Sequence, residues 1–164
     1  MTNKQFWMKA DQIAASRRTQ EEKADEMAAL LKTAYDEDLR MIILFIEKDN
    51  RQHHAYLNLD EKHPNTIGNR CLQCYTSRQR PNEDFISKMR GWQWGYTSTR
   101  DVINNLFNKA IIGSLIFNGY SPEWIVALPK EVLEKHIPGP HPKPEGFVDV
   151  PANGYPEIDR KYFH

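Results

Sequence analysis

The chain has 164 residues, and its 22 Lys and Arg residues balance 22 Asp and Glu residues. With 40% apolar and 27% charged residues, it has the composition of a globular domain, which excludes bulk disorder. The zero formal net charge argues against bulk electrostatic binding to nucleic acid or to an anionic membrane.

Two features of the sequence predict a cytoplasmic protein. The longest apolar run, Met41–Ile46, is far shorter than the roughly 18 residues that span a bilayer, and no secretory signal precedes it. Cys71 and Cys74 are the only cysteines, which is too few for a disulfide framework. We therefore expect reduced thiols, a cytoplasmic location and no membrane partner.

Two amphipathic helices are predicted within residues 1–36. Apolar residues recur at helical spacing from Phe6 to Ala14. Thr19 and Glu22 then match a capping box, in which each side chain accepts a hydrogen bond from the other residue's backbone N–H. The helix that begins there has an apolar stripe along one side, as expected of a helix that packs on its own core.

Six segments have the continuous or alternating apolar patterns of β-strands. They are Met41–Glu47, Ala55–Asp60, Arg70–Thr76, Trp92–Thr97, Ile111–Phe117 and Trp124–Ala127. A loop is expected over Glu61–Asn69, a helix capped by Ser98 is expected to reach about Asn108, and a last helix is expected to begin at Pro129. The sequence thus predicts an α+β fold, with a single mixed or antiparallel sheet of about five strands and helices packed on it.

The composition changes at Pro138. Six of the ten prolines lie between this residue and His164, which predicts a Pro-rich C-terminal extension with polyproline character. Residues 1–137 are then a single α+β domain, and residues 138–164 are the extension. We expect the extension to lie across the surface of the domain or to bind a partner, and disorder is the remaining alternative.

The predicted elements follow one another in a recognisable order. This order is an early apolar strand, a strand that ends in Thr-Ser, a helix, a strand with spaced Gly and Asn, and a short strand before a Pro-led helix. The corresponding segments are Met41–Glu47, Cys74–Ser77, Val102–Phe107, Ile112–Asn118 and Trp124–Leu133. Over about residues 19–137, this order resembles the SseB N-terminal domain family. The resemblance implies an accessory α+β domain that acts through protein contacts, and it supplies no catalytic residues.

Cys71 and Cys74 form a single CxxC motif. A four-thiolate zinc site needs a second pair of cysteines, and on a strand these two positions point to opposite faces. The motif therefore favours buried structural thiols, and we expect no metal and no other cofactor. A zinc site completed by one or two of the six histidines stays open as an alternative.

An aromatic row and a local excess of basic residues lie in the middle of the chain. Trp92, Trp94 and Tyr96 recur at a period of two, so on a strand they share one face. Between Gly68 and Arg100, six Arg or Lys residues accompany two acidic residues. Such residues anchor protein interfaces, bind single-stranded nucleic acid, or, in the case of the aromatic row, pack in a core.

We therefore expect a non-catalytic protein-interaction domain whose partner binds a basic and aromatic surface. The residues predicted to form this surface are Arg78, Arg80, Arg90, Trp92 and Trp94, and no catalytic residue is assigned. A single-stranded nucleic-acid-binding module that uses the same surface is the alternative, and a small metal-dependent enzyme is a further one. Steep salt dependence of binding would indicate the first alternative, and bound metal the second.

Overall fold

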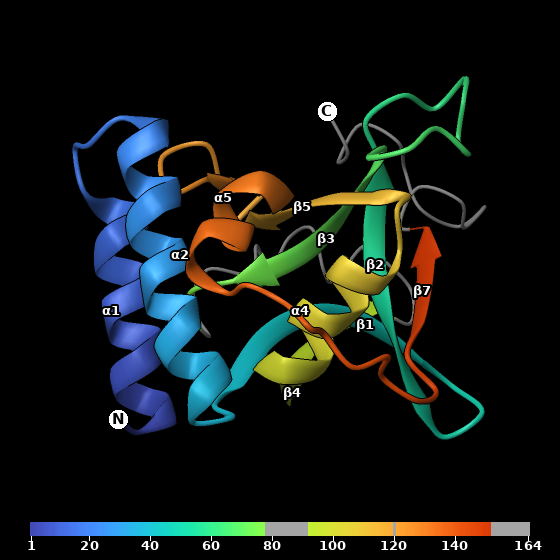
Figure 1. The fold of residues 1–164 in the computed structure, drawn as a ribbon, viewed down its shortest axis with the longest axis horizontal. Helices are drawn as coiled ribbons and strands as arrows, with labels where there is room; N and C mark the ends of the chain where they lie inside the picture. Colours follow the sequence, from blue (N-terminus) through green and yellow to red (C-terminus); the bar gives the residue numbers. More distant parts are fainter. Residues whose placement is uncertain (78–91, 120, 152–164) are drawn as a thin grey trace.

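A computed structural model describes residues 1–77, 92–119 and 121–151. These residues form four α-helices and a seven-stranded sheet (Figure 1). In chain order the elements are α1 (Asn3–Ala15), α2 (Gln20–Asp36), β1 (Arg40–Lys48), β2 (Arg51–Asn58), β3 (Arg70–Tyr75), β4 (Trp92–Ser98), α4 (Thr99–Asn108), β5 (Ile112–Phe117), β6 (Val126–Pro129), α5 (Lys130–His136) and β7 (Val148–Pro151). The predicted α+β fold with a mixed sheet is confirmed, and the sheet has more strands than the five or so expected.

The caps of the two N-terminal helices differ from the prediction. At the start of α1, the Thr2 hydroxyl accepts a hydrogen bond from the Gln5 N–H at 3.1 Å, and the Gln5 side chain accepts one from the Thr2 N–H at 2.9 Å. At the start of α2, Thr19 accepts from the Glu22 N–H at 3.2 Å, but the Glu22 carboxylate accepts from the Thr19 hydroxyl rather than from its backbone. The complete capping box therefore begins α1, and the one expected at Thr19 is half formed.

The strands form one mixed sheet in the order β4-β1-β2-β3-β5-β6, and β7 pairs with β2. β1 lies inside the sheet, antiparallel to β4 along most of its length and to β2 near its C-terminal end. β3 pairs with β2 through its first residues and with β1 through Cys74 and Tyr75. β2 therefore diverges from β1 partway along its length. The parallel pairs are β3 with β5 and β2 with β7.

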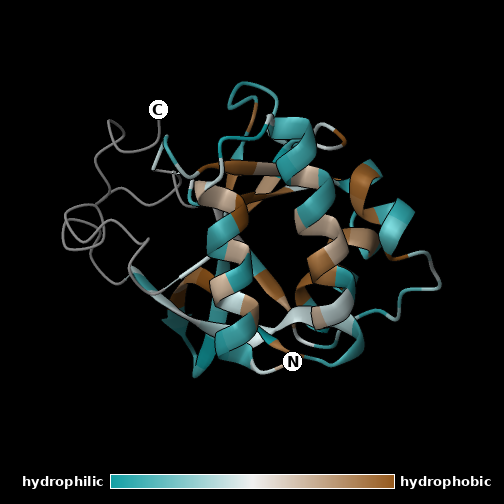
Figure 2. Cartoon of the chain, turned by 90° about the vertical axis from the view of Figure 1, so that its left-hand side faces the viewer, coloured by the Kyte–Doolittle hydropathy of each residue, from teal (hydrophilic) through white to brown (hydrophobic). Residues whose placement is uncertain are grey.

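Helices cover one face of the sheet. Apolar residues of α1, α2, α4 and α5 pack against that face and form the larger of two hydrophobic clusters. Met41, Ile43 and Phe45 of β1 point into this cluster and are almost completely buried. In Figure 2, the most hydrophobic segments gather behind the two N-terminal helices, between them and the sheet. Among the described residues, no helix combines the length and the apolar character needed to cross a membrane.

The opposite face of the sheet carries the second hydrophobic cluster. Its buried members are Ile42, Leu44, Ala55, Tyr75 and Trp92. Trp94 and Tyr96 continue the row on the same face, as the period of two predicts. Trp7 of α1 stacks on Tyr96 with 4.9 Å between ring centroids, and its indole N–H donates to the Arg40 carbonyl at 2.7 Å. These contacts fasten α1 to β1 and to the neighbouring strand β4.

The elements at the C-terminal end show one confirmed cap and one shifted boundary. Ser98 accepts a hydrogen bond from the Asp101 N–H and caps α4, as predicted. Pro129 is the N-cap of α5 rather than its first residue, so this helix begins one residue later than expected. Beyond α5, residues 148–151 of the Pro-rich extension form β7, parallel to β2. Part of the extension is thus a strand of the sheet.

Candidate functional site

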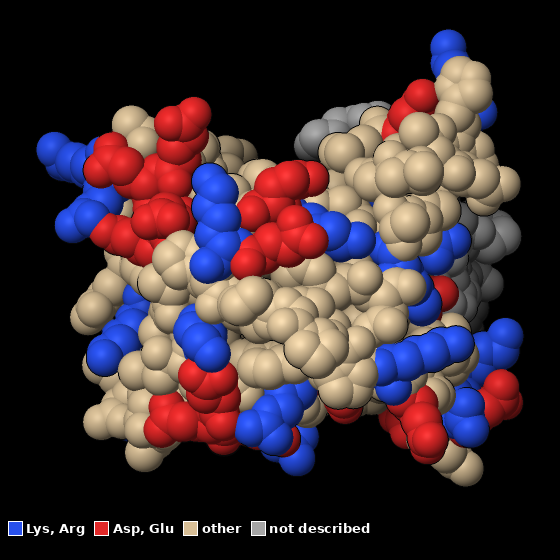
Figure 3. Space-filling view, in the orientation of Figure 1, with Lys and Arg blue, Asp and Glu red and all other residues tan. Residues whose placement is uncertain are grey.

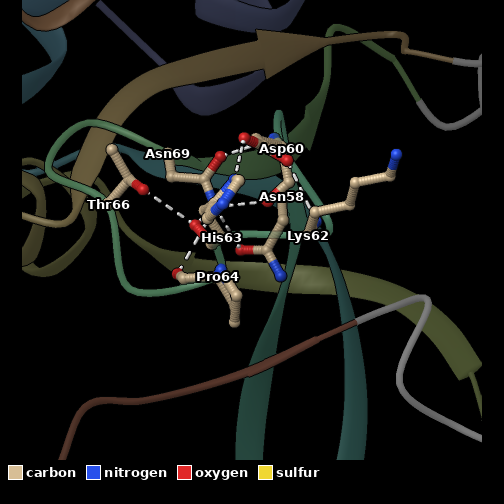
Figure 4. Close-up of polar contacts among 7 residues, drawn as sticks. All are labelled: Asn58, Asp60, Lys62, His63, Pro64, Thr66 and Asn69. Atoms are coloured by element: carbon tan, nitrogen blue, oxygen red, sulfur yellow. Dashed lines mark hydrogen bonds and ion pairs between the residues drawn. The ribbon is translucent and has the colours of Figure 1, made fainter.

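The loop 59–69 joins β2 to β3 and is organised by one buried amide. Asn69 is 4% exposed, and its Oδ1 accepts a hydrogen bond from the Asp60 N–H at 2.6 Å. Its Nδ2 lies 3.1 to 3.3 Å from oxygen atoms of Asn58, Asp60 and His63 (Figure 4). One side chain thereby connects the two ends of the loop and fixes its path.

Further hydrogen bonds fix the tip of the loop. The Asp60 carboxylate accepts from the Lys62 backbone N–H and from His63 Nδ1, each at 2.9 Å, and the Thr66 hydroxyl donates to the His63 carbonyl (Figure 4). The hydrogen bond from His63, together with that from the Lys62 N–H, lowers the pKa of Asp60 below its ordinary value. The loop is therefore ordered by polar contacts rather than by an apolar interior.

The base of the loop is held against the start of β5. The Gly68 N–H donates to the Ala110 carbonyl at 3.0 Å, and Gly68 has a φ of 76°, which favours glycine. A Cβ atom at Gly113 would lie 2.4 Å from the Gly68 carbonyl oxygen. The two backbones thus approach as closely as glycine allows, which fixes the direction of the loop relative to the sheet.

Two large apolar side chains project from this ordered loop. Leu59 is 74% exposed and Ile67 is 80% exposed, whereas Met8, the other exposed large hydrophobic residue of the described part, lies on α1. The Leu59 N–H donates to the Asn69 carbonyl, and Ile67 precedes Asn69 by two residues, so both side chains leave the backbone close to the buried amide. The loop between β2 and β3 projects at the upper right of Figure 1, and the surface of the corresponding lobe in Figure 3 is mostly uncharged. We call Leu59 and Ile67 on this loop the loop surface.

The predicted basic and aromatic surface is described only in part. Arg78, Arg80 and Arg90 lie outside the described residues. Trp92 is 3% exposed and Trp94 is half-buried, and both lie on the face of the sheet opposite the helices. Of these two indoles, that of Trp94 is therefore the more accessible to a ligand.

The two cysteines are free and buried, and they point to opposite faces of β3, as predicted. Cys74 belongs to the cluster under the helices, whereas the Cys71 sulfur accepts a hydrogen bond from the Ser114 hydroxyl at 3.1 Å. Burial raises the pKa of both thiols. Within residues 1–77, 92–119 and 121–151, no three His, Cys, Asp or Glu side chains are grouped as metal ligands.

A second polar group lies where β7 joins the sheet. The Asp149 side chain is 1% exposed, and its carboxylate is 2.8 Å from Lys109 Nζ. It also accepts a hydrogen bond from the Asn105 side chain at 3.0 Å and lies 4.0 Å from the guanidinium of Arg70. One carboxylate from the extension is thus surrounded by two cations and an amide from the body of the domain.

His54 of β2 lies beside this group, paired in register with Asp149 of β7. It is 1% exposed, and its Nε2 is 2.9 Å from the Gln73 carbonyl oxygen, so Nε2 carries the proton and donates it. Burial lowers the pKa of the ring, and among the described residues no hydrogen-bond partner reaches Nδ1. His54 is therefore a neutral ring at ordinary pH.

Neither the loop surface nor the group around Asp149 was identified from the sequence. The loop itself was predicted, and Ile67, an isolated apolar residue in a polar segment, was the available signal for its exposed surface. The group around Asp149 joins side chains from β3, α4 and β7 that are far apart in the chain, so it has no local pattern.

Comparison with known proteins found no match: no protein-family model, no curated protein and no solved structure matches this chain.

Proposed function

We propose that this protein acts by binding a protein partner through the loop surface of Leu59 and Ile67. The observation that supports the proposal is a contrast within the loop 59–69. Its backbone is tied down by the buried Asn69, yet its two large apolar side chains are 74% and 80% exposed. A partner that covers them gains about 1.5–3 kcal/mol for each side chain that becomes fully buried.

The order of the loop favours binding because association otherwise pays for ordering a flexible segment. Immobilising a side chain or a loop residue at an interface costs about 0.5–1.5 kcal/mol, and this cost is subtracted from the affinity. Here the Asn69 amide, the Thr66 hydroxyl and the close approach of Gly113 to Gly68 already fix the loop in the free protein. The partner therefore meets a preformed surface.

The polar groups of the loop indicate the chemistry of the partner. The Asp60 carboxylate already accepts two hydrogen bonds, from His63 and from the Lys62 N–H. A cationic ligand would have to compete with these two donors. The contact is therefore apolar at its centre, with a polar rim, as in most specific protein interfaces. We expect the partner to present an apolar patch rather than a phosphate or a strongly charged segment.

Several expectations from the sequence accompany this proposal. An accessory role through protein contacts, without catalysis, is also what the resemblance to the SseB N-terminal family implies, and that resemblance stays a prediction. The basic and aromatic surface of Arg78, Arg80, Arg90, Trp92 and Trp94 stays a prediction as the partner-binding surface, and single-stranded nucleic acid is the alternative ligand there. A cytoplasmic location also stays a prediction, and two free, buried cysteines support it.

A photo-crosslinking experiment tests the proposal. A photoreactive phenylalanine analogue replaces Ile67 in the full chain, and the protein is irradiated in lysate of its source cells, with and without nuclease and at low and at high salt. The matched control carries the same analogue at Met8, which is exposed on α1. We expect one protein to be crosslinked from position 67 in both salts, and not from position 8.

The captured protein then serves as the probe for a second variant. Leu59→Ser combined with Ile67→Ser should stop it from co-purifying with the folded chain, while Met8→Ser should leave co-purification unchanged. Equal capture from positions 67 and 8, or unchanged co-purification with the double variant, would contradict the proposal. Recovery only of material that nuclease and high salt remove would instead favour nucleic-acid binding through another surface.

A further inference from the structure

The group around Asp149 has the composition of a receptor for a carboxylate. Lys109 Nζ and the Asn105 amide contact the two carboxylate oxygens at 2.8 and 3.0 Å, and the Arg70 guanidinium lies at 4.0 Å. In the described part of the chain, Asp149 is the only carboxylate within ion-pair distance of Lys109 or Arg70. The body of the domain thus supplies the cations, and the C-terminal extension supplies the anion.

The same segment of the extension adds a strand to the sheet. Residues 148–151 pair in parallel with residues 53–56 of β2, so β2 offers a strand edge at this point. Strand addition of this kind gives affinity through backbone hydrogen bonds and specificity through alternate side chains. Here Asp149 is the side chain that gives specificity, because its carboxylate contacts Lys109, Asn105 and Arg70.

A second side chain of the segment is also recognised. The Phe147 ring lies edge-on to His54, with 5.9 Å between ring centroids, and it packs against the main hydrophobic cluster. Phe147 and Asp149 are two residues apart and so meet the same side of the receptor. The site therefore binds a segment in which an aromatic residue is followed, two positions later, by a residue with a carboxylate side chain.

The chain that leads to this strand is held in place at His141, whereas most of the residues between His141 and the strand are exposed. The Asn108 side chain donates to the His141 carbonyl at 3.0 Å, and Phe107 stacks on the His141 ring. Lys143, Glu145 and Gly146, which follow, are exposed. The strand is thus a short ligand joined to the domain by an exposed connection, and such a tether acts as a high local concentration of ligand.

We propose that the edge of β2 beside Lys109 and Arg70 is a binding site for an extended acidic peptide segment of a partner, with an aromatic residue two positions before the carboxylate. The chain's own residues 147–151 fill this site in the structure and compete with such a partner. The site is distinct from the loop surface, and the proposal does not depend on the function assigned to that loop.

The test uses the full chain with Asp149→Asn, which removes the charge of the resident segment and keeps its shape. The probe is a fluorescein-labelled peptide of sequence EGFVDVP, which copies residues 145–151, and the control peptide has Asn in place of Asp. Fluorescence anisotropy gives the affinity of each peptide for the wild-type chain and for the variant. Hydrogen exchange of the segment 147–151, measured at the amides of residues 147–150 because Pro151 has none, reports whether the resident segment has left the site.

We expect faster exchange of residues 147–151 in the Asp149→Asn chain than in the wild type. This variant should bind the Asp peptide at least about tenfold more tightly than the Asn peptide, and at least about tenfold more tightly than the wild-type chain does. Leu59→Ser with Ile67→Ser, added to Asp149→Asn, should leave the peptide affinity unchanged.

Three results would overturn the proposal: unchanged exchange in the Asp149→Asn chain, equal affinity for the two peptides, or no binding of the Asp peptide at millimolar concentration. Lys109→Gln provides a second test if Asp149→Asn does not fold. It keeps the Asn105 and Arg70 contacts of Asp149 and removes the nearest cation, so residues 147–151 should exchange faster than in the wild type. Unchanged exchange in this variant would also overturn the proposal.

Discussion

His54 is buried as a neutral ring, and this determines how it contributes to stability at different pH. Its pKa lies below the ordinary value of 6.5, because burial disfavours the charged form. The unfolded chain binds a proton at this residue near pH 6.5, while the folded chain does so only at lower pH. The contribution of His54 to stability is therefore fully present above pH 6.5 and is lost as the pH falls below that value.

The variant His54→Gln tests this dependence. Glutamine can still donate a hydrogen bond to the Gln73 carbonyl, but it does not titrate. The free energy of unfolding of the variant should therefore fall less between pH 8 and pH 5 than that of the wild type. At pH 8 the variant should be less stable by about 1–3 kcal/mol, because it loses part of the packing of the ring. Urea unfolding at both pH values measures the two effects, and an identical pH dependence of the two proteins would contradict the buried neutral ring.

The two thiols should be unreactive in the folded protein. Because the thiolate is the reacting form, both burial and a raised pKa slow the reaction of Cys71 and Cys74 with Ellman's reagent. At pH 8 the native chain should release almost no thionitrobenzoate within minutes, and the chain in guanidinium should release two equivalents. Rapid reaction of one thiol in the native chain would show that its place in the sheet is wrong.

At the scale of residues, the sequence predicted what depends on near neighbours. The opposite orientation of Cys71 and Cys74 follows from the period of a strand, and the Ser98 cap follows from the residues after it. The environment of His54 was not predictable, because its partners come from distant strands. Gln73 of β3 and Asp149 of β7 meet His54 only after the sheet has formed.

At the scale of elements, the loop 59–69 depends on its contact with β5. Gly113 belongs to the Ile112–Asn118 segment, whose spaced Gly and Asn contribute to the family resemblance, and the structure gives both residues a local role. Gly113 lets the Gly68 backbone approach, and Asn118 adopts a φ of 57° while its side chain bonds to Thr76 and to the Trp124 carbonyl. These roles are structural, so the motif by itself points to no reaction.

Gly113→Ala should displace the base of the loop. The added Cβ would lie 2.4 Å from the Gly68 carbonyl oxygen, so the backbone must move, at a cost of about 1–3 kcal/mol in the free energy of unfolding. Ser114→Ala at the next position adds no atom and serves as the control, with a loss below about 1 kcal/mol. Urea unfolding of the two variants checks the difference, and equal stability would contradict the close approach of the two backbones.

Element boundaries show where sequence patterns stop being sufficient. The spacing of Thr19 and Glu22 predicts a capping box, yet the complete box forms at Thr2 with Gln5. Both sites have the required spacing, and the side-chain geometry decides between them. The start of α5 is a second example, because proline suits both the N-cap and the first helical position. Pro129 is the last residue of β6, so it becomes the N-cap of α5.

At the scale of the whole molecule, the fold class was predictable and the addition of β7 to the sheet was not. Strand and helix patterns in residues 1–137 gave the α+β fold, because each pattern reflects one buried face. The Pro-rich composition after Pro138 gave no indication of β7. That strand forms through a distant partner, the edge of β2, and through the charge of Asp149. Contacts between distant segments also create the loop surface and the Asp149 receptor.

The most direct test of the central claim is the affinity of the crosslinked partner for three full-length chains: wild type, Leu59→Ser with Ile67→Ser, and Met8→Ser. Isothermal titration should show binding at least about tenfold weaker for the double variant, because each anchoring side chain of an interface contributes more than about 1 kcal/mol. The Met8→Ser chain should bind as the wild type does. Equal affinity of the folded double variant and the wild type would contradict the claim that this protein recognises its partner through the loop 59–69.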